Sequence, residues 1–324
     1  MKIRNTFVLL FIVLTYNSCY KDINMEKYRS KPYIVLNCIA NCDTTILAEL
    51  SSSWFYTDNY YSQETPKARI GLYINGKYKE DMIYNKGIYQ SNYHPIPGDS
   101  ISVNTIINGV EIFAADYMPL ETKITNIEIT QTEVPGAGNV YIDPDNKMII
   151  NETDKEFTYN ITFRNTCGKQ FYYLQIDVDG TKSFLGEMNY SYEPAFRITE
   201  EKINKTLSST KIGGQFGLPF SNESMNEGDN TLVIKETGPA FEYNSEEKCR
   251  RVITLYTISE AYYKYILTLL ANDSDSSWQG GLSDIGLSEP IKIYSNINGG
   301  IGIFGCITPT RKKISLPFSL VSRE

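Results

Sequence analysis

Residues 68–83, ARIGLYINGKYKEDMI, hold two β-rich runs on either side of Asn75-Gly76. Asn-Gly between such runs is the strongest short signal of a β-hairpin, because both turn residues must adopt positive φ. The same pair recurs as Asn108-Gly109, again between two β-rich runs. Several short strands separated by close turns are typical of a β-sandwich. We therefore predict an Ig-like β-sandwich over residues 31–118.

Strand patterns resume in the second half of the chain. Residues 157–164 alternate apolar and polar side chains with a period of two, as expected of a half-buried strand. Residues 171–178 form another such run, whereas residues 181–230 are weakly patterned and are expected to form long surface loops. The 25 tyrosines suit pleated, half-buried surfaces. Together these features predict a mainly β fold, with a larger β-rich domain over residues 119–324.

One packed helix is predicted in this second domain, over residues 257–271. Apolar side chains recur there at helical spacing. They are Tyr262, Tyr265, Ile266, Leu269 and Leu270. Thr257 and Glu260 have the spacing of a capping box, in which each side chain accepts a hydrogen bond from a free backbone N–H at the helix start. We expect the apolar stripe to pack on the sheet.

Charge and histidine content exclude several classes of function. The net charge is −7 and the chain has no basic cluster, so we expect no nucleic-acid partner. His94 is the single histidine, which excludes any zinc site that needs two imidazoles. It lies in a proline-containing, loop-like stretch, and the chain has no nucleophile-elbow motif. We interpret His94 as a loop residue.

Five cysteines follow Cys19, and their odd number leaves at least one thiol unpaired. They are Cys38, Cys42, Cys167, Cys249 and Cys306. Spacing alone leaves the disulfide pairing open. Cys38 and Cys42 have neither redox C-x-x-C spacing nor a second pair of metal ligands downstream. We interpret them as buried structural thiols.

The N-terminus has the pattern of a secretory signal peptide over residues 1–18, with a basic start, an apolar run over residues 7–14 and a small residue at the cleavage site. The apolar run is too short to cross a bilayer, which takes roughly 20 residues. Ser18-Cys19 resembles the cleavage site of bacterial lipoproteins. This predicts that Cys19 carries a lipid and that residues 19–30 form a tether. The alternative is a soluble secreted protein in which Cys19 is an ordinary thiol.

Three further motifs have both a chemical and a structural interpretation. Residues 143–146 and 273–275 bring oxygen ligands together as calcium loops do, but neither has the spacing of an EF-hand, and we expect no metal or cofactor. Residues 299–305, GGIGIFG, lack the spacing of a nucleotide-binding loop. The alternation of glycine with Ile and Phe indicates a strand whose glycine face lies against another backbone.

An aromatic cluster is the candidate ligand site. Its members are Trp54, Phe55, Tyr56, Tyr60 and Tyr61. They could form a platform for a sugar or a peptide, because aromatic rings stack on flat apolar faces. The alternative is that alternate rings of this stretch face the core.

Several motifs occur together along nearly the whole mature chain. Tyr33-Ile34-Val35-Leu36 follows the lipidation motif, Ala68-Arg69-Ile70 precedes the first hairpin turn, and residues 296–305, NINGGIGIFG, close the series. In this combination the chain resembles the Bacteroidota outer-membrane lipoproteins known as domain of unknown function DUF4249. These proteins are usually found beside TonB-dependent transporters. The resemblance implies an accessory role in nutrient capture or envelope assembly, and it implies no catalytic residues.

We therefore expect a non-enzymatic protein, lipid-anchored to the outer membrane at the cell surface, that captures ligand for a TonB-dependent barrel or gates it. Two alternatives stay open. One is a cell-surface glycan hydrolase that uses an Asp/Glu pair, and the other is a structural or adhesive envelope protein. Exposed aromatic rings over a concave surface favour capture, whereas two carboxylates that face each other in a cleft favour hydrolysis.

Overall fold

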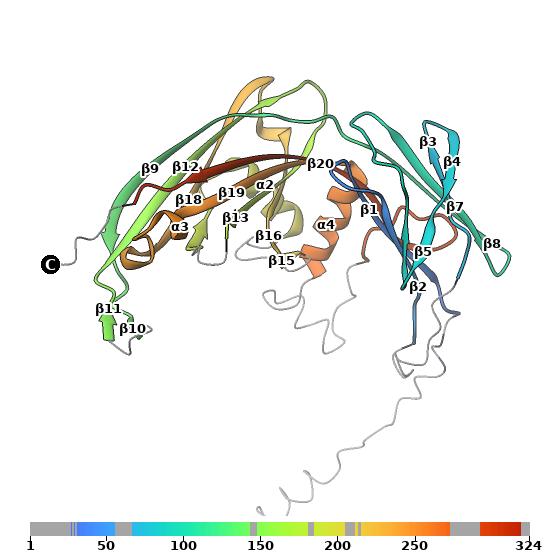
Figure 1. Ribbon diagram of the computed structural model, residues 1–324, viewed down its shortest axis with the longest axis horizontal. Coiled ribbons are helices and arrows are strands. Elements are labelled where there is room, and N and C mark those ends of the chain that lie inside the picture. The colour runs from blue at the N-terminus through green and yellow to red at the C-terminus, as the bar shows by residue number, and fades with distance from the viewer. Residues whose placement is uncertain are drawn as a thin grey trace, which may run out of the picture.

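The fold is organised around one eight-stranded sheet, with the order β17-β13-β19-β20-β1-β2-β6-β5 (Figure 1). The computed structural model describes residues 27, 29, 31–55, 67–142, 148–180, 185–204, 211–212, 215–272 and 292–318. The strands of this sheet are β1 (Ile34–Asn41), β2 (Leu47–Ser52), β5 (Ile83–Asn85), β6 (Ile88–Gln90), β13 (Phe171–Val178), β17 (Leu218–Ser221), β19 (Arg250–Ile258) and β20 (Ile301–Ser315). The mainly β prediction is confirmed.

Two four-stranded sheets cover one face of the central sheet. The first has the order β4-β3-β7-β8 and the second β14-β18-β12-β9. Their strands are β3 (Gly71–Ile74), β4 (Lys77–Asp81), β7 (Ser100–Ile107), β8 (Val110–Tyr117), β9 (Ile124–Pro135), β12 (Thr153–Asn165), β14 (Glu187–Asn189) and β18 (Gly228–Pro239). Period-two alternation along β20 and β19 puts Phe304, Cys306 and Leu255 on the same side of the central sheet. Phe304 and Cys306 belong to the first core and Leu255 to the second.

Strand β20, the last strand that the structure describes, lies beside the first one, β1. It pairs in parallel with β1, from Val35–Ile301 to Asn41–Ile307, and antiparallel with β19. Two hydrophobic cores lie on either side of the predicted division at residue 118, but the first core also contains Ile297, Phe304 and Cys306 from the end of the chain. The central sheet is therefore continuous across the division, and the Ig-like assignment remains a prediction.

Helix α4 (Glu260–Asn272) begins three residues later than predicted. Thr257 is the penultimate residue of β19, and Ser259 caps the helix instead, because its Oγ accepts a hydrogen bond from the Tyr262 N–H at 3.3 Å. Tyr263, Ile266 and Leu270 are buried, and Tyr262 is half-buried against the second core. The predicted stripe is thus confirmed at Tyr262, Ile266 and Leu270, whereas it missed Tyr263, and Tyr265 and Leu269 are only half-buried. The helix packs on the side of the central sheet opposite the two smaller sheets, where Tyr263 stacks on Phe171 of β13 with ring centroids 4.6 Å apart.

A second helix, α2 (Pro194–Ile203), lies where surface loops were predicted. Proline occupies its first turn, Asn204 ends it with φ 53°, and the Glu193 side chain caps its start. The prediction was wrong because Glu193 is an unusual N-cap. The remaining elements are short: α3 (Glu246–Cys249), η3 (Asn222–Ser224), η4 (Ala240–Glu242), β10 (Val140–Ile142), β11 (Met148–Ile150), β15 (Lys211–Ile212) and β16 (Gln215–Phe216).

The two predicted Asn-Gly turns are confirmed by their backbone angles. Asn75 and Gly76 have φ of 52° and 74°, and Asn108 and Gly109 have φ of 51° and 78°. The run predicted to continue to Ile83 is interrupted at Met82, and a further turn at Lys86-Gly87 joins β5 to β6.

Candidate functional site

The closing run, residues 296–305, lies at the seam between the two cores. The Asn296 side chain donates to the Phe304 carbonyl at 2.7 Å and accepts from the Phe304 N–H at 2.9 Å. The backbone of Asn298 exchanges two hydrogen bonds with Phe113 of β8, at 2.9 and 3.1 Å. The most specific motif of the sequence is therefore a structural clasp that ties β8 to β20.

Glycine is required in this run because other chain segments approach it closely. A Cβ at Gly302 would lie 2.2 Å from the Leu36 carbonyl oxygen, and one at Gly305 would lie 2.8 Å from the Tyr262 Cβ. The predicted contact between a glycine face and another backbone is thus confirmed at Gly302. At Gly305 the neighbour is helix α4.

The seam also contains a pocket of about 460 Å³, which we call the seam pocket. It lies where the end of β8, the linker to β9, the start of β13 and the start of α4 meet. Its lining residues are Asp116, Tyr117, Pro119, Leu120, Glu121, Thr122, Thr166, Lys169, Gln170, Phe171, Ile258, Ser259 and Glu260. Apolar and acidic side chains thus line the same cavity, as is common in sites for small ligands.

Asp116 is the most perturbed acid of this pocket. Its Oδ1 accepts a hydrogen bond from the Tyr117 N–H at 2.8 Å, whereas its Oδ2 is buried and has no hydrogen-bond partner of normal geometry. Burial raises the pKa of Asp116 to about 6, although Ser259 and the backbone N–H groups of Tyr117 and Cys306 partly stabilise its charge. A buried, unpaired acceptor of this kind marks a candidate functional group.

The other charges of the seam pocket have partners. Glu121 accepts a hydrogen bond from the Thr310 hydroxyl at 3.0 Å. Glu260 lies 3.2 Å from Lys264 and 3.6 Å from Lys169. Lys264 keeps the pKa of Glu260 below its usual value. Asp116 is consequently the acid of this pocket that retains an oxygen atom, Oδ2, without a hydrogen-bond partner of normal geometry.

A second pocket, of about 490 Å³, lies between the C-terminal end of α2 and the middle of α4. Lys202 and Lys264 line it, together with Tyr294. Lys202 is 2.7 Å from Glu223, and Lys264 is paired with Glu260, so both cations already have carboxylate partners. This pocket therefore offers a ligand fewer polar groups without a partner than the seam pocket does.

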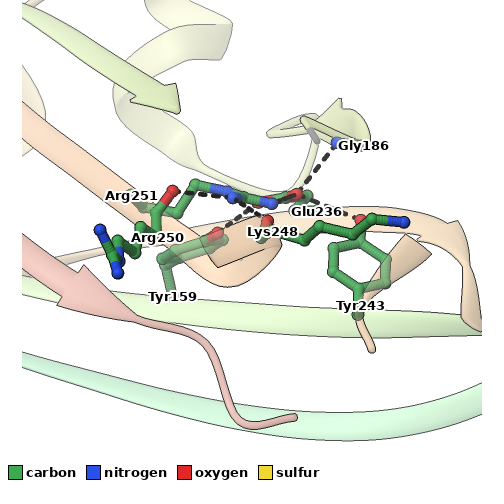
Figure 2. A network of polar contacts seen from close by, with 7 residues as sticks. All are labelled: Tyr159, Gly186, Glu236, Tyr243, Lys248, Arg250 and Arg251. Carbon is green, nitrogen blue, oxygen red and sulfur yellow. Dashed lines mark hydrogen bonds and ion pairs between the residues drawn. The ribbon is translucent and has the colours of Figure 1, made fainter. Parts of the chain in front are cut away.

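The most extensive buried polar cluster lies in the second core, away from both pockets (Figure 2). The Glu236 carboxylate receives two hydrogen bonds from Arg251, with Nη2–Oε1 2.6 Å and Nε–Oε2 3.0 Å. It also accepts hydrogen bonds from the Gly186 N–H at 2.9 Å, from Tyr243 at 3.1 Å and from Tyr159. Glu236 and Arg251 are both fully buried. Burial, followed by the charge of Glu236, raises the pKa of both tyrosines, so they remain donors.

This cluster is saturated rather than reactive. The remaining Arg251 nitrogen, Nη1, donates to the carbonyl oxygens of Lys248 and Arg250 at 3.0 and 2.9 Å. With every charged atom bonded, and with none of its residues lining either of the two pockets described above, the cluster stabilises the core. Sequence reasoning missed it, although Glu236 and Arg251 both fall at inward positions of their strands.

The predicted aromatic platform is only partly within the described residues. Trp54 is 51% exposed and lies two residues after the end of β2. Phe55 is half-buried, and the Arg29 guanidinium carbon lies 4.8 Å from the centroid of its ring. Neither residue lines either pocket. Tyr56, Tyr60 and Tyr61 lie outside the described residues, as do Cys19 and both candidate calcium loops.

No disulfide joins the five cysteines in the part of the chain that the structure describes. Cys38, Cys249 and Cys306 are buried, Cys42 is half-buried and Cys167 is exposed. Burial raises the pKa of the Cys38 thiol. His94 is exposed in its loop, and among the residues that the structure describes no three His, Cys, Asp or Glu side chains could together hold a metal ion.

The fold and the seam pocket together define a mainly β protein with two cores on one sheet and a small-molecule-sized cavity between them. Residues 21–313 match the family described as Domain of unknown function (DUF4249), and the chain belongs to that family. No curated protein matches the sequence. In the described part of the chain, no helix combines the length and apolar character needed to span a bilayer.

Two solved structures show distant similarity. One is an α-L-rhamnosidase from Dictyoglumus thermophilum, with a TM-score of 0.31 and 8% identity over 71% of this chain. The other is a putative membrane anchored protein from Corynebacterium diphtheriae, with a TM-score of 0.20 and 6% identity over 90% of this chain. The chain spans 28% of the first and 61% of the second.

Proposed function

We propose that the protein is a non-enzymatic, lipid-anchored component of an outer-membrane nutrient-uptake system of the TonB-dependent type, which captures a small polar ligand in the seam pocket. The membrane assignment rests on the signal peptide and Cys19. The link to a TonB-dependent barrel rests on the setting in which the DUF4249 family is usually found.

The observation that carries ligand capture is Asp116, which lines the seam pocket, has a pKa that burial raises to about 6, and carries a buried Oδ2 without a hydrogen-bond partner of normal geometry. Burying a hydrogen-bond acceptor without a donor costs free energy. A ligand hydroxyl or amine that donates to Asp116 would offset this cost, whereas an acid exposed to water pays no such cost and gains less from the same contact. Tyr117 and Phe171 line the same cavity and offer ring surface to the apolar part of such a ligand.

Hydrolysis is the second candidate function, and one observation favours it. Asp116 has a pKa of about 6 and lines the same pocket as Glu121, which is the kind of perturbed acid that a glycosidase uses to protonate its leaving group. Against this, Glu121 is bonded to Thr310, and Glu260 is paired with two lysines. A structural or adhesive role remains if the pocket takes no ligand.

Calorimetric titration of the mature chain with panels of oligosaccharides and short peptides tests these roles. Capture predicts saturable binding that Asp116→Asn weakens at least about tenfold, since the variant replaces an ionic acceptor by a neutral one. Glu111→Gln, an exposed acid at the start of β8, serves as the matched control. Turnover of a bound glycan that stops in Asp116→Asn would assign hydrolysis, and binding that survives this variant unchanged would exclude the seam pocket.

A further inference from the structure

The hairpin β10–β11 carries an unusual amount of exposed aliphatic surface. It extends the long β9–β12 pair beyond the kink at residues 135–138 and projects from the fold (Figure 1). Val140 is paired with Ile150, and Ile142 with Met148. Paired residues of an antiparallel ribbon share a face, and residues two apart along a strand lie on the same side. The four side chains therefore form one apolar face, which we call the hairpin face.

The hairpin face is turned away from the protein. Val140, Ile142, Met148 and Ile150 are 56%, 72%, 72% and 57% exposed. Tyr141, which points to the other side, packs on Phe241 with ring centroids 5.2 Å apart. This ring contact fixes the ribbon against the body, so that its apolar side is held outward. Contiguous exposed apolar surface of this kind marks a contact site.

We propose that the hairpin face rests on the surface of the lipid bilayer to which the chain is tethered. This inference depends on the membrane anchor of the proposed function. Cys19 precedes Lys31 by twelve residues, so the tether reaches at most about 40 Å. A tether of this length keeps the folded part of the chain within reach of the bilayer surface.

The opposite end of the molecule supports the same orientation. In Figure 1 the hairpin and the start of β1 both lie at the lower edge of the fold, at its two ends. Exposed Tyr33 and Trp54 lie at the start of β1, where Tyr33 and Ser53 exchange two hydrogen bonds of 2.8 Å. Tyr and Trp suit the headgroup layer, whereas aliphatic side chains enter just below it.

The size of the hairpin face also favours lipid over a protein partner. Stable protein interfaces bury about 800 Å² on each side, which is more than four side chains supply. A small apolar contact is sufficient for a domain that a tether already holds at high effective concentration. The connecting residues 143–147 contain two carboxylates and one lysine, so attraction to anionic headgroups is not the driving force.

Hydrogen exchange on tethered protein tests the proposal. The mature chain, with Cys19→Ala and an N-terminal histidine tag, is bound to phosphatidylcholine vesicles that contain a nickel-chelating lipid. We expect amide exchange in residues 140–150 to slow about tenfold on tethering and to recover when imidazole releases the protein. Added salt, without imidazole, should leave the slowing unchanged.

Substitutions identify the surface responsible. Ile142→Ser with Met148→Ser should abolish the slowing, whereas Ile106→Ser, at a residue that is 70% exposed on β7, should retain it. Equal exchange rates for tethered and free protein would overturn the proposal. Slowing that occurs without vesicles, when a second copy of the chain is present, would assign the hairpin face to self-association and would overturn the proposal. Slowing that occurs only when an outer-membrane protein extract is added would assign it to a protein partner and would overturn the proposal as well. Because the tag supplies the tether, a negative result in this assay cannot be caused by absent lipidation. Lipidation at Cys19 is tested separately, by membrane fractionation of cells that express Cys19→Ala.

Discussion

Replacing Arg251 by methionine tests the buried cluster of the second core. Methionine replaces the arginine chain only as far as Nε, and it leaves the Glu236 carboxylate buried with only the Gly186 N–H and two tyrosine hydroxyls as donors. It removes two charge-assisted hydrogen bonds of 2.6 and 3.0 Å. It also removes the Nη1 donor from the carbonyl oxygens of Lys248 and Arg250, of which the Arg250 carbonyl keeps the Asp179 N–H at 3.2 Å. Loss of one partner of a buried ion pair costs about 3–5 kcal/mol. For a chain of this size, we expect the melting temperature to fall by roughly 6–12 °C.

The adjacent arginine provides a matched control. Arg250 belongs to the same strand but is exposed, 3.9 Å from an exposed Glu246. Arg250→Met should therefore change the free energy of unfolding by less than about 1 kcal/mol in urea titrations. Equal effects of the two substitutions would refute the view that the cluster stabilises the core.

A double variant separates lost attraction from stranded charge. Arg251→Met combined with Glu236→Leu removes both buried charges and should be less destabilised than Arg251→Met alone. The opposite result is a loss of unfolding free energy in the double variant that equals or exceeds the sum of the losses in the two single variants. That result would show that the tyrosine and backbone contacts, rather than the unpaired carboxylate, determine the destabilisation.

Three further predictions concern the pocket, the clasp and the aromatic segment. Asp116 binds its proton more tightly in the folded chain, where its pKa is about 6, than at its ordinary pKa of 3.8. The free energy of unfolding should therefore fall as pH rises from about 4 to about 6. Asp116→Asn should remove this contribution, so that the urea midpoint depends less on pH over the same range. Gly302→Ala, with φ 120° and a carbonyl oxygen 2.2 Å from the new Cβ, should lose about 2–4 kcal/mol in the same assay. Gly76→Ala, which meets nothing within 4 Å, should lose about 1 kcal/mol. Comparable losses would contradict the requirement for glycine where β20 approaches β1. Trp54→Ala should leave both the melting temperature and ligand binding in the seam pocket unchanged, because Trp54 is half exposed and lines neither pocket. A large drop in melting temperature would make Trp54 a core residue.

The local parts of the fold were predictable because their signals are local. Asn75-Gly76 and Asn108-Gly109 adopt the positive φ that their turns require. The alternation of Phe157 to Phe163 places every second side chain in the second core. Helix α2 was missed because its apolar positions are separated by charged residues and its cap is a glutamate.

The long-range parts were not predictable from a single sequence. The pairing of β20 with β1 joins residues that are 266 positions apart, as in the hydrogen bond from the Ile303 N–H to Asn37. No periodicity in either segment specifies such a partner. For this reason two cores could be inferred, whereas the continuous sheet and the seam between the cores could not.

The candidate site shows the same limit. Asp116 has no distinguishing motif, and its raised pKa results from three separate segments that meet around it. Glu236 gave a usable signal, because a charged residue at an inward position between Ile234 and Gly238 requires a buried partner. Its partner, Arg251, could be assigned only once β18 and β19 were placed in facing sheets.

The central claim is that the protein is a subunit of an outer-membrane importer. A pull-down from detergent-solubilised outer membranes, with a tag at the C-terminus of the chain, tests it most directly. The account predicts that a TonB-dependent barrel is recovered with the chain in a fixed molar ratio. It also predicts that the barrel is no longer recovered from the membrane fraction when Cys19 is replaced by alanine. Recovery of the lipidated chain alone, with no barrel, would contradict it.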